Sequence, residues 1–474
     1  MTGERVDLLV AGAGTAGIPT AVFAARRGAR VLLVEAQPRI GGTLHVSSGH
    51  MSAAGTRLQA DRGIADSAQA HYDDVMRISK GTAHPTLLRV ATTHAAATID
   101  WLMAEGFDMG PECPVIAYSH EPYLVPRTYW GRDKGRSILA VLARLLDAAV
   151  GGSNAVDLRL GTRLRALHAA DGGGWVARLA TGESAVTVHA REVVLATGGY
   201  GANPELFSRV TGGYPLLSPA PVGADGSGLE LALALGGRLQ NQSIYLPTVA
   251  GVPDRPGGHA LDWDRKSNLT PQHRLPWEIY VNLAGERFVA EDDPSPDARE
   301  RALKRQSGLA FWVVFDQAML DAAPPLFVGT PKDEILDRFR WHPAYRKADS
   351  VAALAQACGM DAAVMERTVA RYNAAVADGN DPLGRRHLPA PIGRGPFHAI
   401  RHQGVTLRCW AGIEIDDSLR VVGGDGRPLP GLYAIGEIIG GAALSGDSFA
   451  SGMSITPALT FGRLLGQQLL EFAR

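Results

Sequence analysis

The amino-acid sequence predicts an α/β protein: a parallel sheet, extended by a small antiparallel sheet, is interrupted by an inserted α+β domain. Two observations support this fold class. Residues 6–35 alternate between apolar runs of strand length and a helical pattern, as parallel β-α-β units do. Between about residues 240 and 385, prolines and charged residues become frequent, and core strand patterns resume only afterwards. We therefore predict a first domain made of residues 1–238 and 389–474, and a second made of residues 239–388.

Bulk composition limits the class of protein. With 474 residues, 46% hydrophobic and 20% charged, the chain is long enough for two or three globular domains. A formal net charge of −1 gives no electrostatic basis for binding nucleic acid or an acidic membrane surface. Cys113, Cys358 and Cys409 are far apart and have no metal, iron–sulfur or haem-attachment spacing. No apolar stretch approaches the roughly 18 residues of a membrane span, so we expect a cytoplasmic protein without a metal site.

The first fifty residues carry the most specific motif. It comprises a strand, a glycine turn, a helix, a strand and an acid: Val6–Ala11, Gly12-x-Gly14-x-x-Gly17, Ile18–Gly28, Val31–Val34 and Glu35. Gly12 permits a tight turn, Gly14 lets a pyrophosphate approach the backbone, and Gly17 lets helix and strand pack closely. Thr15 and Ala16 lie in the turn, where the helix N-terminus favours negative charge. Glu35 has the spacing of an acid that binds a ribose hydroxyl.

The residues after Glu35 favour FAD over a nicotinamide dinucleotide. Ala36 follows the acid directly, and Gly41-Gly42-Thr43 can bring further backbone N–H groups to the same pyrophosphate. A nicotinamide dinucleotide has little use for this second loop, whereas the longer FAD has. The next stretch, which includes Ser48 and Gly49, is small and polar, as needed where a flat ring lies against backbone. These features predict a Rossmann-like FAD-binding domain.

Other elements follow from their periodicity. Apolar residues at 3–4 spacing predict helices over Ala65–Ser79 and Leu87–Glu105, and alternation over Ala155–Ala190 predicts the small antiparallel sheet. Thr456 as N-cap, with Pro457 at the first helical position, predicts a final helix to about Phe472. The remaining expected elements are helices at 229–235 and 362–377 and strands at 193–197, 311–315, 407–415, 419–422 and 432–435.

The order of these motifs resembles the flavoprotein family of fumarate reductases, succinate dehydrogenases and 3-ketosteroid dehydrogenases. The matching segments span nearly the whole chain: Val10–Gly17, Glu35, Gly41–Thr43, Val193–Asn203, Ala224–Gly228, Asn282–Phe288, Tyr372-Asn373 and Gly431–Glu437. The resemblance implies FAD as cofactor. It also implies that the inserted domain, residues 239–388, caps the substrate; an oligomerisation domain is the alternative.

The resemblance adds cofactor contacts from later in the chain. Ala196-Thr197-Gly198 would end the strand beneath the dinucleotide, and Asp225 would lie in a turn near the flavin. Gly436-Glu437 would hold ribityl hydroxyls. The N-terminus of the final helix, Ser454-Ile455, would point at the flavin and stabilise its reduced form through the helix dipole.

The sequence departs from the fumarate-reducing members at their acid-binding residues. Leu246 stands where those members have a histidine, and no arginine follows Glu291 closely. The late histidine and arginine are replaced within Ala442–Ser448. These losses argue against fumarate reduction.

The ketosteroid branch instead uses tyrosines, and the chain has several candidates. Tyr245 and Tyr123, then Tyr118, are the tyrosines that we expect to abstract a proton. The Tyr-Pro-Gly signature of that branch is absent near the last glycine cluster, so a smaller ketone fits as well as a steroid. Arg127 is a fourth candidate; Arg127 and Arg408 could each bind the carboxylate of a keto acid or pair with an acid of the protein.

The expected activity is therefore FAD-dependent α,β-dehydrogenation of a ketone, cyclic or steroid-like, with a tyrosine taking the proton and flavin N5 the hydride. The partners would be a small-molecule ketone and an external electron acceptor: a quinone, a dye or oxygen. Two alternatives stay open. One is a fumarate reductase-like enoate or keto-acid reductase, and the other is a non-catalytic flavoprotein subunit of a complex.

Overall fold

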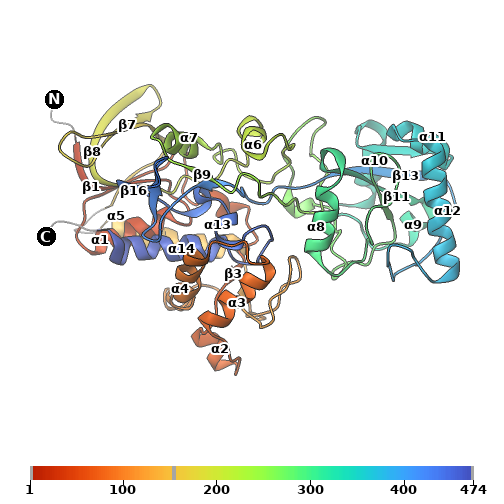
Figure 1. The fold of residues 1–474 in the computed structure, drawn as a ribbon, viewed down its shortest axis with the longest axis horizontal. Coiled ribbons are helices and arrows are strands. Elements are labelled where there is room, and N and C mark those ends of the chain that lie inside the picture. The colour runs from red at the N-terminus through yellow and green to blue at the C-terminus, as the bar shows by residue number, and fades with distance from the viewer. Residues whose placement is uncertain (1–3, 152–155, 471–474) are drawn as a thin grey trace.

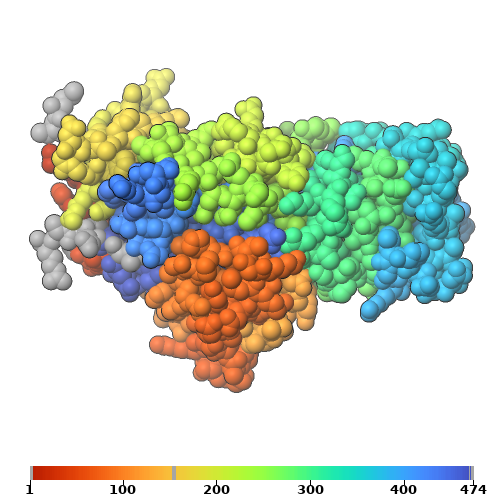
Figure 2. Space-filling view, viewed as in Figure 1, coloured from red at the N-terminus to blue at the C-terminus, as the bar shows by residue number. Residues whose placement is uncertain are grey.

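The computed structural model describes residues 4–151 and 156–470. Two lobes, each with its own sheet, lie end to end in an elongated molecule (Figure 1). The helices α2, α3 and α4 (Arg57–Asp61, Ala68–Ile78 and Pro85–Ala104) project from the first lobe beside the junction (Figure 2). No helix within these two stretches has the length and apolar character that crossing a membrane requires.

The first lobe is organised on a sheet of order β15-β16-β8-β1-β2-β5. Its strands are β15 (Arg420–Val422), β16 (Pro428–Ala434), β8 (Ser184–Leu195), β1 (Glu4–Ala11), β2 (Val31–Val34) and β5 (Val156–Arg159). All neighbours pair in parallel except β15, which is antiparallel to β16. The four C-terminal residues of β1 are fully buried, as expected of a central parallel strand. Residues from both ends of the chain therefore share one sheet.

The small antiparallel sheet extends the N-terminal half of β8. It consists of β6 (Thr162–Ala169), β7 (Trp175–Thr181) and β8, paired in that order. The prediction for this region is confirmed with one change: β5 belongs to the parallel sheet. The predicted first residue, Ala155, lies outside the described part of the chain.

The helices of the first lobe pack on its sheet and around it, and they hold the glycine turn in place. They include α1 (Gly17–Arg26), α5 (Lys134–Val150), α6 (Pro204–Thr211), α7 (Ser227–Ala234), α13 (Ala442–Ser445) and α14 (Ile455–Leu464). A Cβ atom at Gly17 would lie 1.9 Å from the Gly12 carbonyl oxygen, and one at Gly462 would lie 2.3 Å from that of Ala16. Only glycine lets α1 and α14 approach this closely.

The final helix begins earlier than predicted. Its N-cap is Ser454, so Thr456 lies inside the helix and Pro457 is its third residue. The Thr456 hydroxyl instead accepts a hydrogen bond from the Ser52 backbone N–H at 2.8 Å. This partner is distant in the sequence and is brought close by tertiary packing. The helical path continues into a π-turn to Leu469, and the predicted end at Phe472 lies outside the described residues.

The second lobe has an antiparallel sheet of order β10-β11-β13-β12 and a core of its own. The strands are β10 (Ile279–Val281), β11 (Ala310–Asp316), β13 (Phe397–Gln403) and β12 (Tyr345–Ala348), and the helices are α8 (Pro296–Lys304), α9 (Gln317–Ala322), α10 (Lys332–Trp341), α11 (Val351–Cys358) and α12 (Ala362–Asp378). Because β13 pairs with both β11 and β12, this domain extends to about residue 403 and not to 388.

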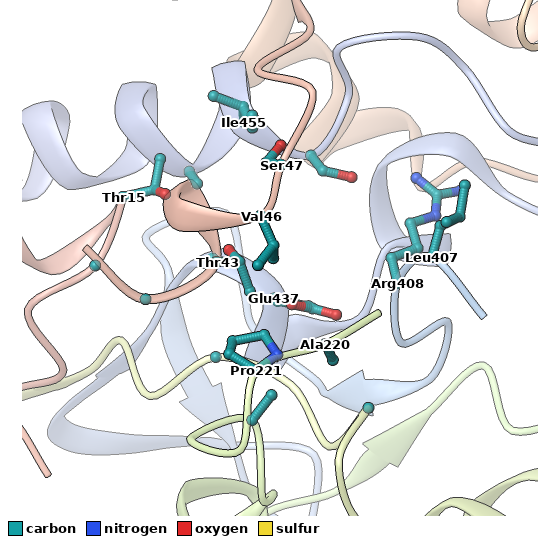
Figure 3. Close-up of a pocket in the computed structure, with 18 of the residues that line it drawn as sticks. Thr15, Thr43, Val46, Ser47, Ala220, Pro221, Leu407, Arg408, Glu437 and Ile455 are labelled. Atoms are coloured by element: carbon teal, nitrogen blue, oxygen red, sulfur yellow. The ribbon is translucent and has the colours of Figure 1, made fainter. Parts of the chain in front are cut away.

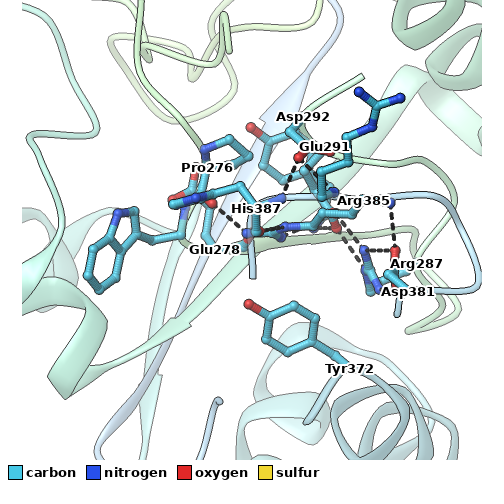
Figure 4. A network of polar contacts seen from close by, with 12 residues as sticks. Pro276, Glu278, Arg287, Glu291, Asp292, Tyr372, Asp381, Arg385 and His387 are labelled. Atoms are coloured by element: carbon cyan, nitrogen blue, oxygen red, sulfur yellow. Dashed lines mark hydrogen bonds and ion pairs between the residues drawn. The ribbon is translucent and has the colours of Figure 1, made fainter. Parts of the chain in front are cut away.

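A buried ion-pair network braces the second lobe (Figure 4). Arg287 pairs with Glu291 and Asp381, each at 2.6 Å, and Arg385 lies 3.2 Å from Glu291. The ring of Tyr372 lies against both guanidinium groups, at 5.3 and 5.2 Å. The family-like segments Asn282–Phe288 and Tyr372-Asn373 therefore support the fold, remote from the cavity described below.

Two short pairings complete the fold: β3 (Met51–Ser52) with β4 (Thr128–Tyr129), and β9 (Leu239–Gln240) with β14 (Gly412–Ile413). The predicted strand 407–415 is thus regular only at β14. Residues 406–408 have no regular strand pairing and instead face a cavity, which explains the difference.

Candidate functional site

A cavity of about 1230 Å³ is lined by both lobes. Sixteen of the twenty predicted cofactor-binding residues line it: Gly12, Gly14, Thr15, Ala16, Glu35, Ala36, Gly42, Thr43, Ser48, Ala196, Thr197, Gly198, Gly436, Glu437, Ser454 and Ile455. Thr15 and Arg408 stand on opposite sides of the cavity, with Glu437 between them (Figure 3). A large concave site shared by two lobes is where ligands usually bind.

The glycine turn has room for a pyrophosphate. Gly12 has a φ of +106°, which turns the chain sharply at the end of β1. A Cβ atom at Gly14 would meet nothing within 4 Å, and one at Gly42 would lie 3.9 Å from the Gly14 Cα. The two glycine loops thus leave open space beside the N-terminus of α1, which favours anions.

Two carboxylates on the cavity wall are positioned by backbone N–H groups. Glu35 accepts hydrogen bonds from Ala13 at 2.9 Å and Gln37 at 2.8 Å. Glu437 accepts one from the Cys409 backbone N–H at 2.9 Å. Burial raises the pKa of Glu437 despite this hydrogen bond. Each carboxylate retains acceptor capacity toward a ribose or ribityl hydroxyl.

The start of α14 also faces the cavity. Ser454 and Ile455 line the wall, and no side chain caps the helix N-terminus. The Thr197 hydroxyl lines the wall as well, and it is buried without a hydrogen-bond partner among the described residues. Thr456 donates its backbone N–H to the Gly452 carbonyl at 3.2 Å, and Pro457 has no N–H group. The positive end of the helix and the Thr197 hydroxyl fit a ligand with polar atoms along its length, as FAD has.

Four predicted cofactor residues do not line the cavity. Gly17 and Gly49 allow close backbone packing, since a Cβ atom at Gly49 would lie 2.5 Å from Lys134, and Gly41 has a φ of +107°. Asp225 accepts from the Ser227 N–H at 3.0 Å and pairs with Arg163 at 2.7 Å, so it stabilises the start of α7.

Three of the four predicted catalytic residues are also off the cavity wall. The Tyr123 hydroxyl donates to the Ser451 carbonyl at 2.6 Å, and the Tyr245 hydroxyl lies 3.0 Å from the Thr406 hydroxyl. Arg127 is buried in ion pairs with Asp66 at 2.9 Å and Asp74 at 3.4 Å. None of the three therefore lines the cavity in which a substrate would bind, so the structure does not support the predicted direct role in catalysis.

Tyr118 is the predicted catalytic residue that does line the cavity. Its side chain is 47% exposed, so the phenol has access both to the cavity and to solvent. The neighbouring Ser119 and His120 line the cavity too. His120 stacks on Phe449 with ring centroids 3.7 Å apart, and burial holds its pKa well below the usual value, so the imidazole is neutral.

Arg408 is the functional candidate that the sequence left undecided. It is 4% exposed and lines the cavity, and its Nη2 atom donates to the Ser445 hydroxyl at 2.5 Å and the Ser448 carbonyl at 3.2 Å. Its Nε and Nη1 atoms are buried with no hydrogen-bond partner among the described residues, and no described acid forms an ion pair with it. Desolvation lowers the pKa of Arg408 to about 10, so the group stays charged at neutral pH.

The rest of this half of the cavity is aromatic and cationic. Phe449 contacts Arg408, whose guanidinium carbon lies 4.2 Å from the ring centroid. From the second lobe, Trp263 and Lys266 line the wall, with the Lys266 ammonium 4.2 Å from the indole ring. Among the described residues, Glu35 and Glu437 are the only acids on the cavity wall. This half therefore suits a small anion with a flat apolar body.

Comparison with known proteins identifies the family. The model for the FAD binding domain matches residues 7–447, which is most of the chain. This chain is a member of the FAD binding domain family. It is an FAD-dependent oxidoreductase of the fumarate reductase and succinate dehydrogenase type, as its sequence motifs predict, and it acts on CH–CH groups.

Relatives of this FAD-dependent oxidoreductase include reductases and dehydrogenases. The fumarate reductase (cytochrome) of Shewanella frigidimarina is 28% identical over 99% of this chain and 78% of its own length. The 4-oxocyclohexanecarboxylate 2-dehydrogenase of Sinomonas cyclohexanicum is 26% identical over 98% of this chain and 92% of its own length. The solved 3-ketosteroid delta1-dehydrogenase from Sterolibacterium denitrificans shares the fold, with a TM-score of 0.79 at 21% identity over 98% of this chain and 99% of its own.

Some wall residues of the FAD-dependent oxidoreductase have a weak signal in the sequence, and others have none. Arg408 lies in a segment with an apolar strand pattern, where a single charge is a visible exception. His120 lies in the aromatic loop that also holds Tyr118. Lys266 lies in the inserted domain, where charges are common and one lysine does not stand out.

Proposed function

We propose that the protein catalyses the α,β-dehydrogenation of a cyclic ketone that carries a carboxylate. The observation that carries this proposal is Arg408, a buried guanidinium on the cavity wall whose Nε and Nη1 atoms have no hydrogen-bond partner among the described residues. Glu437 and Glu300 raise its pKa from a distance, but no described acid forms an ion pair with it. A ligand anion that pairs with the guanidinium offsets the cost of burying it. A planar carboxylate matches the geometry of a guanidinium better than other small anions.

The surroundings of Arg408 favour a ring as the body of the substrate. Phe449, Trp263 and Trp130 line the cavity with flat apolar faces, and Leu444 and Met453 add aliphatic surface. A ring of six carbons buries its apolar surface against such walls, while its carboxylate reaches Arg408.

Tyr118 is the residue that we propose as the base. As its phenolate, it takes a proton from the carbon next to the ketone and passes it to solvent, to which the side chain is half exposed. FAD, when bound, supplies the acceptor for the hydride that leaves the neighbouring carbon. Turnover also requires an external electron acceptor such as a quinone, a dye or oxygen.

The relatives are compatible with this assignment. The Sinomonas cyclohexanicum enzyme, named as a 4-oxocyclohexanecarboxylate 2-dehydrogenase, is matched over 92% of its own length. Its named substrate has both groups that the cavity would recognise, a ring ketone and a carboxylate. The fold is also that of the ketosteroid dehydrogenase compared above.

The test is anaerobic reduction of the purified yellow protein. We expect 4-oxocyclohexanecarboxylate to bleach the flavin absorbance, and cyclohexanone, which lacks the carboxylate, to do so only at much higher concentration. Absence of bleaching with every cyclic ketone would overturn the proposal.

A second candidate is reduction of an enoate, favoured by the same unpaired arginine and by the relatives named as fumarate reductases. It makes the opposite prediction. Dithionite-reduced protein would be reoxidised within seconds by fumarate, acrylate or urocanate, while the ketones leave the oxidised flavin unchanged.

A further inference from the structure

Two threonine hydroxyls on the cavity wall have buried acidic groups behind them. Thr248 and Thr406 both line the cavity, on neighbouring segments joined by paired backbone hydrogen bonds between Thr248 and Val405, each of 2.9 Å. Behind Thr406 lies the Tyr245 hydroxyl, at 3.0 Å. Behind Thr248 lies the buried side chain of Glu300, whose pKa a side-chain hydrogen bond with Thr248 lowers. In each pair, a buried proton-bearing side chain lies behind a threonine, and the threonine lies between it and the cavity.

We propose that Thr248 and Thr406 bind the carbonyl oxygen of the substrate, with Glu300 and Tyr245 as positioning residues behind them. This inference rests on the proposed function, because it assigns the ketone end of the same substrate. A threonine hydroxyl has one hydrogen to donate and two lone pairs that accept. When a group behind it donates to the oxygen, the hydroxyl hydrogen is free to donate toward the cavity.

The reaction needs such donors. Removal of the proton next to the ketone places negative charge on the carbonyl oxygen, and preorganised donors stabilise that charge. The proton goes to Tyr118 and the electron pair of the broken C–H bond moves toward the oxygen. This electron pair then moves back to form the carbon–carbon double bond, while a hydride leaves the neighbouring carbon for FAD. Neither threonine changes its bonding; each only donates.

Glu300 can donate only while it is protonated. Burial raises the pKa of Glu300 to about 8, so the carboxyl group is mostly neutral at pH 7. The charged groups that act on it are Arg299 and Asp297 on its own helix α8 and Arg408 across the junction; the Tyr245 phenol also faces it. Above the pKa of Glu300 its carboxylate becomes an acceptor and draws the Thr248 hydrogen away from the substrate.

Tyr245 provides a donor that does not switch off. Burial raises its pKa above the usual value, so the phenol stays protonated across the working range. Its ring is held by stacking on Tyr214, with centroids 4.9 Å apart, and edge-on against Phe207 at 5.6 Å. This explains why a tyrosine singled out from the sequence is important to the site without lining it.

The pH profile of turnover tests the role of Glu300. In the holoenzyme, ionisation of the base Tyr118 affects the pH profiles of wild type and Glu300→Gln alike, so the two profiles are compared as a ratio. The ratio of wild-type kcat to Glu300→Gln kcat for oxidation of the ketone should fall as pH rises through about 8, because the glutamine amide donates at every pH. Turnover of Glu300→Gln at pH 7 should be retained. Glu300→Ala should lower kcat at pH 7 about tenfold or more. Glu366→Gln, an exposed change on α12, is the control. A Glu300→Gln profile that falls as the wild type does would overturn the role of Glu300.

Thr248 is tested by a matched pair and by binding. Thr248→Val should lower kcat about 100-fold, whereas Thr248→Ser, which keeps the hydroxyl, should restore most of it. Binding of 4-hydroxybenzoate, which places a hydroxyl opposite a carboxylate on a ring, is followed by calorimetry. If 4-hydroxybenzoate binds and its affinity depends on Arg408 but not on Thr248 or Thr406, this inference fails and the proposed function stands. If wild type neither binds it nor oxidises any ketone, the proposed function fails first.

Discussion

At the scale of single residues, two buried arginines have opposite surroundings, and only Arg408 lines the cavity. Arg127 is compensated by Asp66 and Asp74, so its charge belongs to the fold. Arg408 is held by the neutral partners Ser445 and Ser448 and has no acid paired with it among the described residues. The same side chain is thus structural in one place and available to a ligand in the other.

Substitution should separate the two roles. Arg127→Gln leaves the buried Asp66 carboxylate without its cation, while Asp74 keeps its ion pair with Arg77. We therefore expect it to lower the free energy of unfolding by about 3 kcal/mol. Arg408→Gln removes an uncompensated charge, so the free energy of unfolding should stay within about 1 kcal/mol of wild type. It should raise KM for a carboxylate-bearing ketone about 100-fold and leave KM for cyclohexanone unchanged. Denaturant titrations and steady-state kinetics check both. Equal losses of stability would contradict this division.

At the scale of elements, the N-terminal turn combines a packing glycine with a ligand glycine. Gly17 is pressed against the Gly12 carbonyl, while Gly14 faces open space on the cavity wall. Sequence spacing alone assigns both to one motif. Their surroundings separate the glycine that α1 needs from the glycine that the cofactor needs.

A larger side chain at each position should have a different effect. Gly17→Ala drives a methyl group into backbone at 1.9 Å, so we expect a loss of about 3 kcal/mol or more, or failure to fold. Gly14→Val leaves the apoprotein as stable as wild type but fills the space beside the pyrophosphate, weakening FAD binding at least about tenfold. Apoprotein melting and FAD titration by fluorescence distinguish these effects. Unchanged FAD affinity in Gly14→Val would contradict the placement of the pyrophosphate.

How much the sequence could predict follows from how local each signal is. The strand–turn–helix motif and Glu35 lie within thirty-odd residues, and short-range geometry determines them. Whether the hydroxyls of Tyr123 and Tyr245 face the cavity depends on the residues that pack beside them. These are Ser451 for Tyr123 and Thr406 for Tyr245, each more than a hundred residues away in the sequence. The segment 407–415 reads as a strand because apolar residues surround Arg408. Only the assembled cavity shows why a charge is kept there.

At the scale of the whole molecule, helix α8 fastens the second lobe to the first. Asp297 on this helix pairs with Lys80 at 2.6 Å and accepts from the Ser448 hydroxyl at 2.8 Å. Arg301 pairs with Asp297 at 2.8 Å and with Asp447 at 3.1 Å. Ser448 also accepts from Arg408 through its carbonyl group. The junction and the proposed substrate anchor therefore share a residue, and α8 also carries Glu300.

Loosening this junction should affect α8 before the rest of the second lobe. Burial opposes ionisation of Asp297, but hydrogen bonds from Arg301, Lys80 and Ser448 lower its pKa below the usual value. Its contribution to stability is therefore present above about pH 4 and is lost as pH falls through the folded-state pKa.

Asp297→Asn should mimic that loss at pH 7. We expect amide hydrogen exchange in α8 to accelerate about tenfold, with exchange in β11 unchanged. Asp321→Asn, which removes the exposed pair with Lys332, is the matched control and should leave both unchanged. Equal acceleration in α8 and β11 would instead show that Asp297 stabilises the second lobe itself and not its attachment.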